Sequence, residues 1–255
     1  MSGLDLERVS AQLRGQRLRG PLIFHSQTTS TNDDARALAA AGAAEGTVVI
    51  AGEQTQGRGR YQRSWFGHPD YALLFSLILR PTFPAEQLPR LVNTIGVGVA
   101  EGCAAAARCA VGTKWPNDII VAGLKVGGIL IEVPEPGCAV AGIGLNVLGG
   151  NADLPPELRE IAGTLAVASA VPLTREDVLA SVLNAVEHWY DALLRGEWEE
   201  VVARQRELET TLGQERTVLV GGTDITGTVR DLSPDGGLML ETPQGPRTIT
   251  VGEVL

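Results

Sequence analysis

The chain has 255 residues, of which 44% are hydrophobic, and these values predict a globular protein with a sizeable core and more than one domain. It carries 21 lysines and arginines against 30 aspartates and glutamates, a net charge of −9. This acidity, without any dense basic run, argues against general nucleic-acid binding and against binding to a membrane surface.

The first part of the chain predicts short elements that alternate in type. Residues 4–18 suggest one short helix, and PLIFH at residues 21–25 predicts a strand. STNDDARALAAAG, residues 30–42, begins with capping residues and two early acids and stops at a glycine, which is typical of a helix. TVVIAG at residues 47–52 is then expected to be a short buried strand.

The segment after this strand, GEQTQGRGRYQRSW, alternates two glycines with two arginines before a third arginine and a tryptophan. Gly57 and Gly59 permit a tight backbone, so Arg58 and Arg60 can converge on one anionic group. The pattern predicts a phosphate or carboxylate site. A solvated turn and an RNA-contacting tract are the alternatives that this segment alone leaves open.

The middle of the chain predicts a strand, a helix, a hairpin and another strand. YALLFSLILRP at residues 71–81 is a longer strand closed by proline, and residues 86–108 form an alanine-rich helix. In the hairpin, DIIV and LKVGGILIEV flank a turn at Ala122 and Gly123. CAVAGIGLNV at residues 138–147 is expected to be buried because its apolar run is continuous.

The last part predicts helices followed by short strands. Thr174 is expected to cap a helix over residues 176–194 that ends before Gly196, and a further helix covers residues 198–212. Short strands separated by Gly, Pro and Asp turns then predict a small barrel. The predicted domains are residues 1–212 and residues 213–255.

The three cysteines, Cys103, Cys109 and Cys138, lack metal-ligand spacing, and no HExxH motif accompanies the histidines. We expect buried thiols in a reducing compartment. No secretory signal is evident at the start of the chain, and the apolar stretch at residues 91–107 is interrupted by polar residues. A cytoplasmic protein without a membrane anchor is therefore expected.

Five motifs occur in the order and approximate spacing of one family: STN at 30–32, the Gly/Arg segment at 52–65, KWPND at 114–118, LKVGGIL at 124–130 and GIGLN at 142–146. On these motifs the chain resembles the biotin protein ligases, from about Ser30 to its C-terminus. The resemblance implies an α+β fold, with a mixed-sheet catalytic domain like that of class II synthetases and a small SH3-like β-barrel at the C-terminus.

The same resemblance implies the chemistry. Biotin is activated with ATP to biotinyl-5′-AMP, pyrophosphate is released, and the biotinyl group passes to a lysine of a biotin carboxyl carrier protein domain of a biotin-dependent carboxylase. Mg²⁺ is the implied metal. The lead before Ser30 is too short for a winged-helix DNA-binding domain, so a monofunctional ligase that binds no nucleic acid is expected. A homodimer is left open.

Adenylate formation depends on alignment and on cations, since a carboxylate oxygen attacks the α-phosphorus of ATP. The resemblance assigns catalysis to Lys125, Arg58 and Arg60. Lys125 would bridge the biotin carboxylate and the α-phosphate, and the two arginines would hold the carboxylate and the adenylate phosphate. A lysine on a buried strand is costly unless it meets an anion, although a lysine beside a hairpin turn is usually solvated.

The other ligand contacts are assigned by matching the motifs. The biotin-binding residues are Ser30, Thr31, Asn32, Gln54, Gly57, Arg58, Arg60, Lys125, Gly128, Gly142 and Gly144. The ATP-binding residues are Arg58, Arg60, Arg63, Trp65, Lys114, Asn117 and Asn146, with the Trp65 indole beside adenine. Asp118 and Asn146 are the candidate Mg²⁺ ligands, because hard cations prefer oxygen. Ser30 and Thr31 also suit helix caps, and Asp118 also suits a turn cap.

Two positions depart from the family pattern. Gln62 stands where many relatives have glycine, and Gly127 stands where they often have alanine. Three alternatives remain beside the biotin ligase: a lipoate ligase, a non-catalytic RNA-contacting module and a biotin-sensing repressor. The motifs disfavour the first, the net acidity the second, and the short lead before Ser30 the third.

Overall fold

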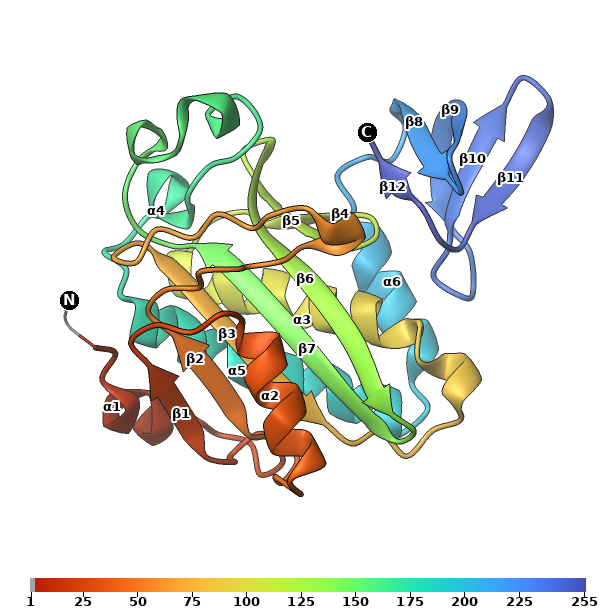
Figure 1. Cartoon of the computed structure of the whole chain (residues 1–255). Coiled ribbons are helices and arrows are strands. Elements are labelled where there is room, and N and C mark those ends of the chain that lie inside the picture. The colour runs from red at the N-terminus through yellow and green to blue at the C-terminus, as the bar shows by residue number, and fades with distance from the viewer. Residues whose placement is uncertain (1–2) are drawn as a thin grey trace.

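The computed structural model describes residues 3–255, which form a large mixed sheet with helices on both faces and a smaller second sheet (Figure 1). The large sheet has the order β1-β2-β3-β7-β6-β5-β4. Its strands are β1 (Leu22–His25), β2 (Val48–Ala51), β3 (Ala72–Leu79), β4 (Gly112–Lys114), β5 (Asp118–Val121), β6 (Leu124–Glu135) and β7 (Cys138–Asn146). The β1–β2 pair is parallel and the remaining neighbours are antiparallel, which confirms the predicted mixed sheet.

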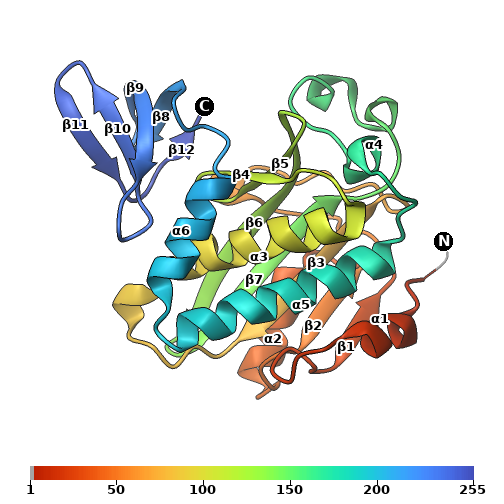
Figure 2. The same cartoon turned by 180° about the vertical axis from the view of Figure 1, so that it is seen from behind.

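Helices cover the large sheet unequally. The α-helices are α1 (Leu6–Gln12), α2 (Thr31–Ala40), α3 (Arg90–Ala107), α4 (Leu165–Ala168), α5 (Arg175–Leu194) and α6 (Trp198–Leu208), and short 3₁₀ turns occur at Arg60–Gln62, Ala85–Gln87, Asn151–Asp153 and Pro156–Leu158. The long helices α3 and α5 lie side by side on one face, and α2 lies on the other (Figures 1 and 2). Beyond this one short helix, the α2 face is crossed by the segment between β2 and β3 (Figure 1).

The packing of α3 against α5 depends on two glycines one turn apart. A Cβ atom on Gly98 would lie 2.6 Å from Val186 Cα, and one on Gly102 would lie 2.4 Å from Val182 Cα. The two backbones therefore approach more closely than side chains would permit. This contact forms much of the core, together with β3, which is buried along its whole length.

The second sheet is the C-terminal unit, and one of its turns packs against the large domain. Its antiparallel order is β11-β10-β9-β8-β12, with β8 (Glu215–Val220), β9 (Thr223–Leu232), β10 (Leu238–Thr242), β11 (Gly245–Ile249) and β12 (Glu253–Val254). Gly236 O accepts hydrogen bonds from Asn93 Nδ2 and Trp115 Nε1, both at 3.1 Å, and Pro234 O accepts one from Trp198 Nε1 at 2.6 Å. The small barrel and the α+β class are thereby confirmed, whereas the exact boundary at residues 212 and 213 stays a prediction.

The buried carboxylate of Glu209 joins the two units. Glu209 accepts hydrogen bonds from the backbone N–H of Trp115 at 2.9 Å and from the N–H and hydroxyl of Thr211 at 3.1 and 2.6 Å. Burial raises the pKa of this carboxyl above its ordinary range. The linker into the small barrel is thus tied to the segment that follows β4.

Several predicted boundaries are confirmed and three are wrong. Thr174 Oγ1 caps α5 by accepting from Asp177 N at 3.2 Å, and the hairpin turn has φ of 50° at Ala122 and 82° at Gly123. The helix expected at residues 86–108 begins at Arg90, because proline at position 89 disfavours helical conformation in the residue before it. The other two errors are both helices that are shorter than expected: α6 ends at Leu208, where Glu209 turns extended, and the first helix covers only Leu6–Gln12.

A second buried carboxylate fixes the segment that leads into β1. Glu187 on α5 is 6% exposed and accepts the backbone N–H groups of Gln16, Arg17 and Leu18 at 2.6, 2.7 and 3.1 Å. A Cβ atom at Gly15 would lie 1.9 Å from the Glu187 carboxylate, so only glycine fits beside it. Glu187 thus satisfies three consecutive backbone donors of this segment, and Asn184, one turn earlier on α5, accepts from Arg14 N and donates to Gln12 O.

We expect Glu187→Ala to lower the free energy of unfolding by about 3 kcal/mol, because three backbone donors would lose a charged acceptor in a buried setting. Urea denaturation would measure the change. Glu200 is exposed on α6, and its replacement by alanine is the matched control, with an expected loss below about 1 kcal/mol. Equal losses in the two variants would show that Glu187 does not anchor the segment.

Candidate active site

A cleft of about 280 Å³ lies on the face of the large sheet that carries α2. In Figure 1 the orange segment between β2 and β3 crosses this face over β7 and β6. The cleft collects most of the residues predicted from the sequence, namely Ser30, Thr31, Asn32, Gln54, Arg58, Arg60, Arg63, Trp65, Asn117, Asp118, Lys125, Gly128, Gly142, Gly144 and Asn146. Segments far apart in the chain therefore meet at one site.

Gly57 and Lys114 are the two predicted site residues that do not line the cleft. Gly57 is buried and its carbonyl accepts from Trp65 N at 2.9 Å, so it shapes the Gly/Arg segment from within. Lys114 lies on the edge strand β4, where burial lowers its pKa below the ordinary lysine value. A phosphate contact by Lys114 stays a prediction.

The Gly/Arg segment folds back on itself. Gly59 N donates to Arg63 O at 2.7 Å, and Arg58 pairs with Ser64 as an isolated antiparallel bridge. Tyr61 and Gln62 between them have φ of 55° and 59°, in the left-handed region that favours glycine. Glycine at position 62, the residue common in relatives, would thus adopt this turn at less cost than glutamine.

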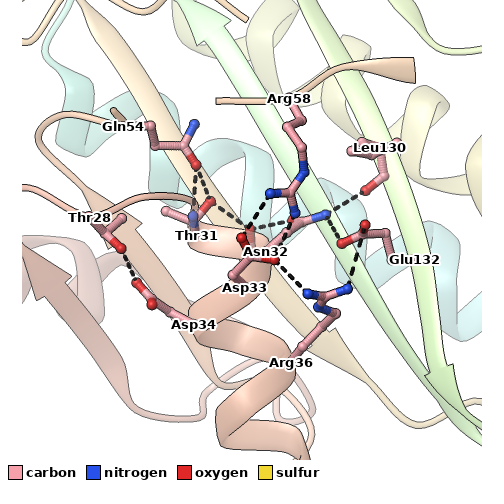
Figure 3. Close-up of polar contacts among 11 residues, drawn as sticks. Thr28, Thr31, Asn32, Asp33, Asp34, Arg36, Gln54, Arg58, Leu130 and Glu132 are labelled. Atoms are coloured by element: carbon pink, nitrogen blue, oxygen red, sulfur yellow. Dashed lines mark hydrogen bonds and ion pairs between the residues drawn. The ribbon is translucent and has the colours of Figure 1, made fainter. Parts of the chain in front are cut away.

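Arg58 is held by a carboxylate that the sequence analysis did not single out (Figure 3). Arg58 Nη1 and Nη2 donate to Asp33 Oδ2 and Oδ1 at 2.8 and 2.7 Å, a two-point ion pair. The hydrogen bond from Arg58 lowers the pKa of Asp33 below its ordinary value, and the same bond raises the pKa of Arg58. Both groups are therefore charged throughout the neutral range.

Lys125 lies at the centre of the cleft, on β6. Its Nζ is 2.6 Å from Asp118 Oδ1 and 5.7 Å from the centre of the Trp65 ring, so a carboxylate and an aromatic face both contact the ammonium. The side chain is 36% exposed. The ammonium is thus neither buried without a partner nor simply solvated.

The other two arginines differ in their partners. Arg63 pairs with Glu253 of β12, so the C-terminal unit contributes to the cleft. Arg60 instead has neutral partners, Asn117 Oδ1 at 3.3 Å and the Tyr61 hydroxyl at 3.2 Å, and no carboxylate pairs with it within residues 3–255. Arg60 is therefore the cleft arginine whose charge no acidic side chain offsets.

Polar side chains gather at the α2 end of the cleft (Figure 3). Gln54 Oε1 accepts from the N–H and hydroxyl of Thr31 at 2.7 and 3.0 Å, which leaves the Gln54 amide as a donor. Ser76 Oγ bonds Thr31 Oγ1 and Asn32 Oδ1, both at 2.7 Å. Ser30 occupies the N-cap position of α2, but its side chain makes no capping hydrogen bond. The cap interpretation is therefore wrong for the Ser30 hydroxyl.

The three glycines of the strands make room for side chains. A Cβ atom on Gly142 would lie 2.2 Å from Asn32 Oδ1, and one on Gly144 would lie 2.5 Å from the Trp65 ring. A Cβ atom on Gly128 would lie 3.2 Å from the same ring. Trp65 thus lies against glycines assigned to biotin, and its Nε1 is buried without a hydrogen-bond partner. The predicted contact of Trp65 with adenine stays a prediction.

Two side chains with oxygen atoms suited to a divalent cation, Asp118 and Asn146, line the cleft. Asn146 Nδ2 donates to Gly163 O at 3.2 Å, so its Oδ1 is the atom left to accept. Asp118 supplies a carboxylate. No group of three or more His, Cys, Asp or Glu side chains with metal-site geometry occurs in the part of the chain that the structure describes. Two ligands fit the way Mg²⁺ binds together with substrate phosphates.

Sequence patterns missed residues that the fold brings to the cleft from outside the motifs. Leu158, Ile161 and Ala162 come from the loop before α4, and Glu253 and Val254 come from β12. None of these belongs to a motif. Asp33 is different, because it directly follows STN and is one of two early acids in the predicted helix. Its position in the same predicted helix turn as Ser30, Thr31 and Asn32 was the signal that could have placed it near the site.

The arrangement suits an elongated anionic ligand with a polar ring at one end. Thr31, Asn32 and Gln54 offer hydrogen-bond donors and acceptors at the α2 end, and cations follow along the cleft. Among residues 3–255 no helix has the length and hydropathy needed to cross a membrane.

Comparison with known protein families identifies the two parts of the chain separately. Residues 24–147 match the biotin/lipoate A/B protein ligase family, and residues 211–255 match the biotin protein ligase C terminal domain. The first match contains all five motifs. The second covers the strands of the small barrel.

Similar proteins and structures agree with these matches. A biotin--[acetyl-CoA-carboxylase] ligase of Mycobacterium tuberculosis is 34% identical, over 97% of this chain and 96% of its own length. A bifunctional ligase/repressor BirA of Bacillus spizizenii is 33% identical, over 91% of this chain and 73% of its own length. The structure of a biotin protein ligase from Aquifex aeolicus in complex with biotin and ATP is 29% identical, with a TM-score of 0.82 over 92% of this chain and 97% of that chain. The chain therefore belongs to the biotin/lipoate A/B protein ligase family and, within it, to the biotin protein ligases.

Proposed function

We propose that the cleft activates biotin with ATP to biotinyl-5′-AMP and then transfers the biotinyl group to a lysine of an acceptor protein. The observation that carries this proposal is the meeting of Arg60, Lys125 and Arg58 with the polar α2 end in one cleft. The Aquifex relative, whose fold is shared over most of the chain, is described as a complex with biotin and ATP.

In the first step a carboxylate oxygen of biotin attacks the α-phosphorus of ATP. A new P–O bond forms as the bond to the β-phosphate oxygen breaks, and pyrophosphate leaves. Lys125 and Arg60 offset the negative charge that gathers between carboxylate and phosphate. To do so, the Lys125 ammonium exchanges its Asp118 partner, 2.6 Å away, for the substrate anions. The Thr31, Asn32 and Gln54 side chains orient the biotin ring.

The same exchange frees a ligand for Mg²⁺. Once Lys125 turns toward the substrates, the Asp118 carboxylate is available, and Asn146 Oδ1 is a second oxygen acceptor in the same cleft. Asp118 and Asn146 would hold Mg²⁺, which would offset negative charge on the phosphates when bound. Asp118 and Asn146 are accordingly the metal ligands in this proposal.

In the second step a lysine amine of the acceptor attacks the carbonyl of the adenylate, and AMP leaves with the bonding electrons of the C–O bond. The chain's own two lysines are Lys114, partly buried on β4, and Lys125, in the cleft itself, so we place the acceptor lysine on a separate protein. We assign this role to a biotin carboxyl carrier protein domain, since the Mycobacterium relative is named for acetyl-CoA-carboxylase. The three free cysteines of this chain suit a cytoplasmic location. A homodimer stays a prediction.

Pyrophosphate exchange into ATP tests the substrate. We expect exchange with biotin and Mg²⁺, and none above background with lipoate or octanoate, because the α2 end of the cleft presents donors and acceptors that suit a ureido ring. Omission of Mg²⁺ should abolish the signal. Exchange with lipoate in place of biotin would assign the chain to the other branch of the family.

We expect Lys125→Ala to slow adenylate formation roughly 10²- to 10³-fold, the usual cost of removing one preorganised group that stabilises a transition state. Synthetic biotinyl-5′-AMP should restore much of the acceptor labelling, since Lys125 acts before transfer. Arg19→Ala removes an exposed cation from outside the cleft lining and should have a much smaller effect. Equal loss of both half-reactions in Lys125→Ala would make Lys125 structural.

We expect Arg60→Gly to release the adenylate, because it removes the arginine whose charge no acidic side chain offsets. Free adenylate would then label lysines of an unrelated bystander protein, and mass spectrometry of that protein would measure the increase. Arg19→Gly is the control, since Arg19 is exposed and does not line the cleft. Unchanged bystander labelling in Arg60→Gly would show that Arg60 does not retain the intermediate.

A further inference from the structure

We propose that Asp33 is a positioning residue that fixes the Arg58 side chain for ligand binding, and that Arg36 and Glu132 hold Asp33 in turn (Figure 3). This inference rests on the proposed function, since Arg58 is taken to contact biotin or its adenylate. Asp33 does not line the cleft, whereas Arg58 does. Any effect of Asp33 on the ligand must therefore pass through another side chain.

The geometry of the Asp33–Arg58 pair fixes where the free donors of Arg58 lie. A guanidinium has five N–H groups, and the two contacts of 2.7 and 2.8 Å use one on each terminal nitrogen. Three N–H groups remain for a ligand. Because the two-point contact restricts both the position and the plane of the guanidinium, it also restricts the directions of those three groups.

Asp33 is itself prevented from turning away. Arg36, one turn along α2, donates from Nη2 to Asp33 Oδ1 at 2.6 Å, and its Nη1 lies 4.0 Å from Glu132 Oε1 on β6. Glu132 Oε2 in turn accepts from Asn32 Nδ2 at 2.9 Å. The carboxylate that holds Arg58 is therefore connected to the sheet and to the polar end of the cleft, as the dashed lines of Figure 3 show.

The pair also divides the work between two arginines. Asp33 offsets the charge of Arg58 but fixes the directions of its three remaining N–H groups. Arg58 therefore contributes chiefly by orienting the ligand through hydrogen bonds. Arg60 has neutral partners and contributes net positive charge. Removal of Asp33 should consequently weaken ligand binding despite removing a negative charge from beside an anion site. An acid that merely competed with the ligand for Arg58 would give the opposite result.

The adjacent residue provides a matched control. Asp34 is also an acid in the first turn of α2, where both stabilise the helix N-terminus. Its carboxylate accepts from Thr28 Oγ1 at 2.7 Å, and it makes no contact with Arg58. Asp34→Ala therefore reports the loss of a helix-terminal acid without loss of the Arg58 contact.

Limited trypsin digestion of the ligand-free protein tests the contact without relying on activity. Trypsin must take the Arg58 side chain into its own pocket, which requires the Asp33 pair to break. We expect Asp33→Ala to speed cleavage after Arg58 roughly 10-fold, since hydrogen bonds to charged groups contribute about this much. Asp34→Ala should cleave at the wild-type rate. Equal rates for the two variants would overturn the proposal.

A double-mutant cycle tests whether Asp33 acts through Arg58. Asp33→Ala should raise KM for biotin roughly 10- to 100-fold with a smaller change in kcat, and Arg58→Ala should do the same. In the Arg58→Ala background, Asp33→Ala should add nothing further. Additive effects, or a lower KM in Asp33→Ala, would overturn the proposal. Asp33→Asn, which keeps the size of the side chain, replaces Asp33→Ala if the latter is unstable.

The trypsin digestion and the double-mutant cycle together distinguish failure of this inference from failure of the proposed function. If the wild-type protein shows no pyrophosphate exchange with biotin, the function is wrong. Trypsin cleavage after Arg58 would still decide whether Asp33 holds the side chain, and biotin affinity measured by calorimetry would replace KM in the cycle.

Discussion

The cleft places several cationic side chains within one ligand-sized space. The acidic side chains around the cleft hold these cations close together. Like charges repel at such distances, and the cost rises where protein replaces water. Three carboxylates relieve this repulsion, each from a different element: Asp33 from α2, Asp118 from β5 and Glu253 from β12. Substrate binding then becomes an exchange of anions, in which phosphates and a carboxylate replace protein side chains.

This exchange explains why distant parts of the fold meet at the cleft. The α2 end is open because the long helices occupy the opposite face of the sheet, where Gly98 and Gly102 permit their close contact. The C-terminal unit reaches the cleft through β12 because the turn at Gly236 and the buried Glu209 fix it against Trp115. The small barrel thus contributes a carboxylate to the electrostatics of the site.

The sequence predicted the elements well where local signals are strong. Thr174 as a cap and the turn at Ala122 and Gly123 were predictable because capping and turn chemistry depend on a few adjacent residues. The start of α3 was missed because Pro89 and a run of helix-forming residues gave conflicting signals, and the proline decided the outcome. Most of the predicted site residues line one cleft. They could be predicted because the five motifs were interpreted together, in their order and spacing.

What the sequence did not supply was the partners of those residues. Nothing local indicates that Glu253 pairs with Arg63, 190 positions earlier, since that contact depends on how the C-terminal unit packs. The prediction for the strand glycines was also incomplete. Gly142 and Gly144 were expected to admit ligand, and the space beside them is taken by Asn32 and Trp65. A glycine shows that something comes close, but tertiary packing decides what it is.

The scarcity of lysine has a consequence for the enzyme's own chemical integrity. A mixed anhydride of a carboxylic acid and a phosphate acylates amines readily, so a protein that makes one is exposed to its own product. Here the two lysine side chains are Lys125, paired with Asp118 in the cleft, and Lys114, partly buried on β4. The 19 arginines that carry the remaining positive charge stay protonated and do not react as nucleophiles. Adenylate that escapes therefore meets almost no acylable side chain on the protein that produced it, and the surface is inert toward the reagent it handles.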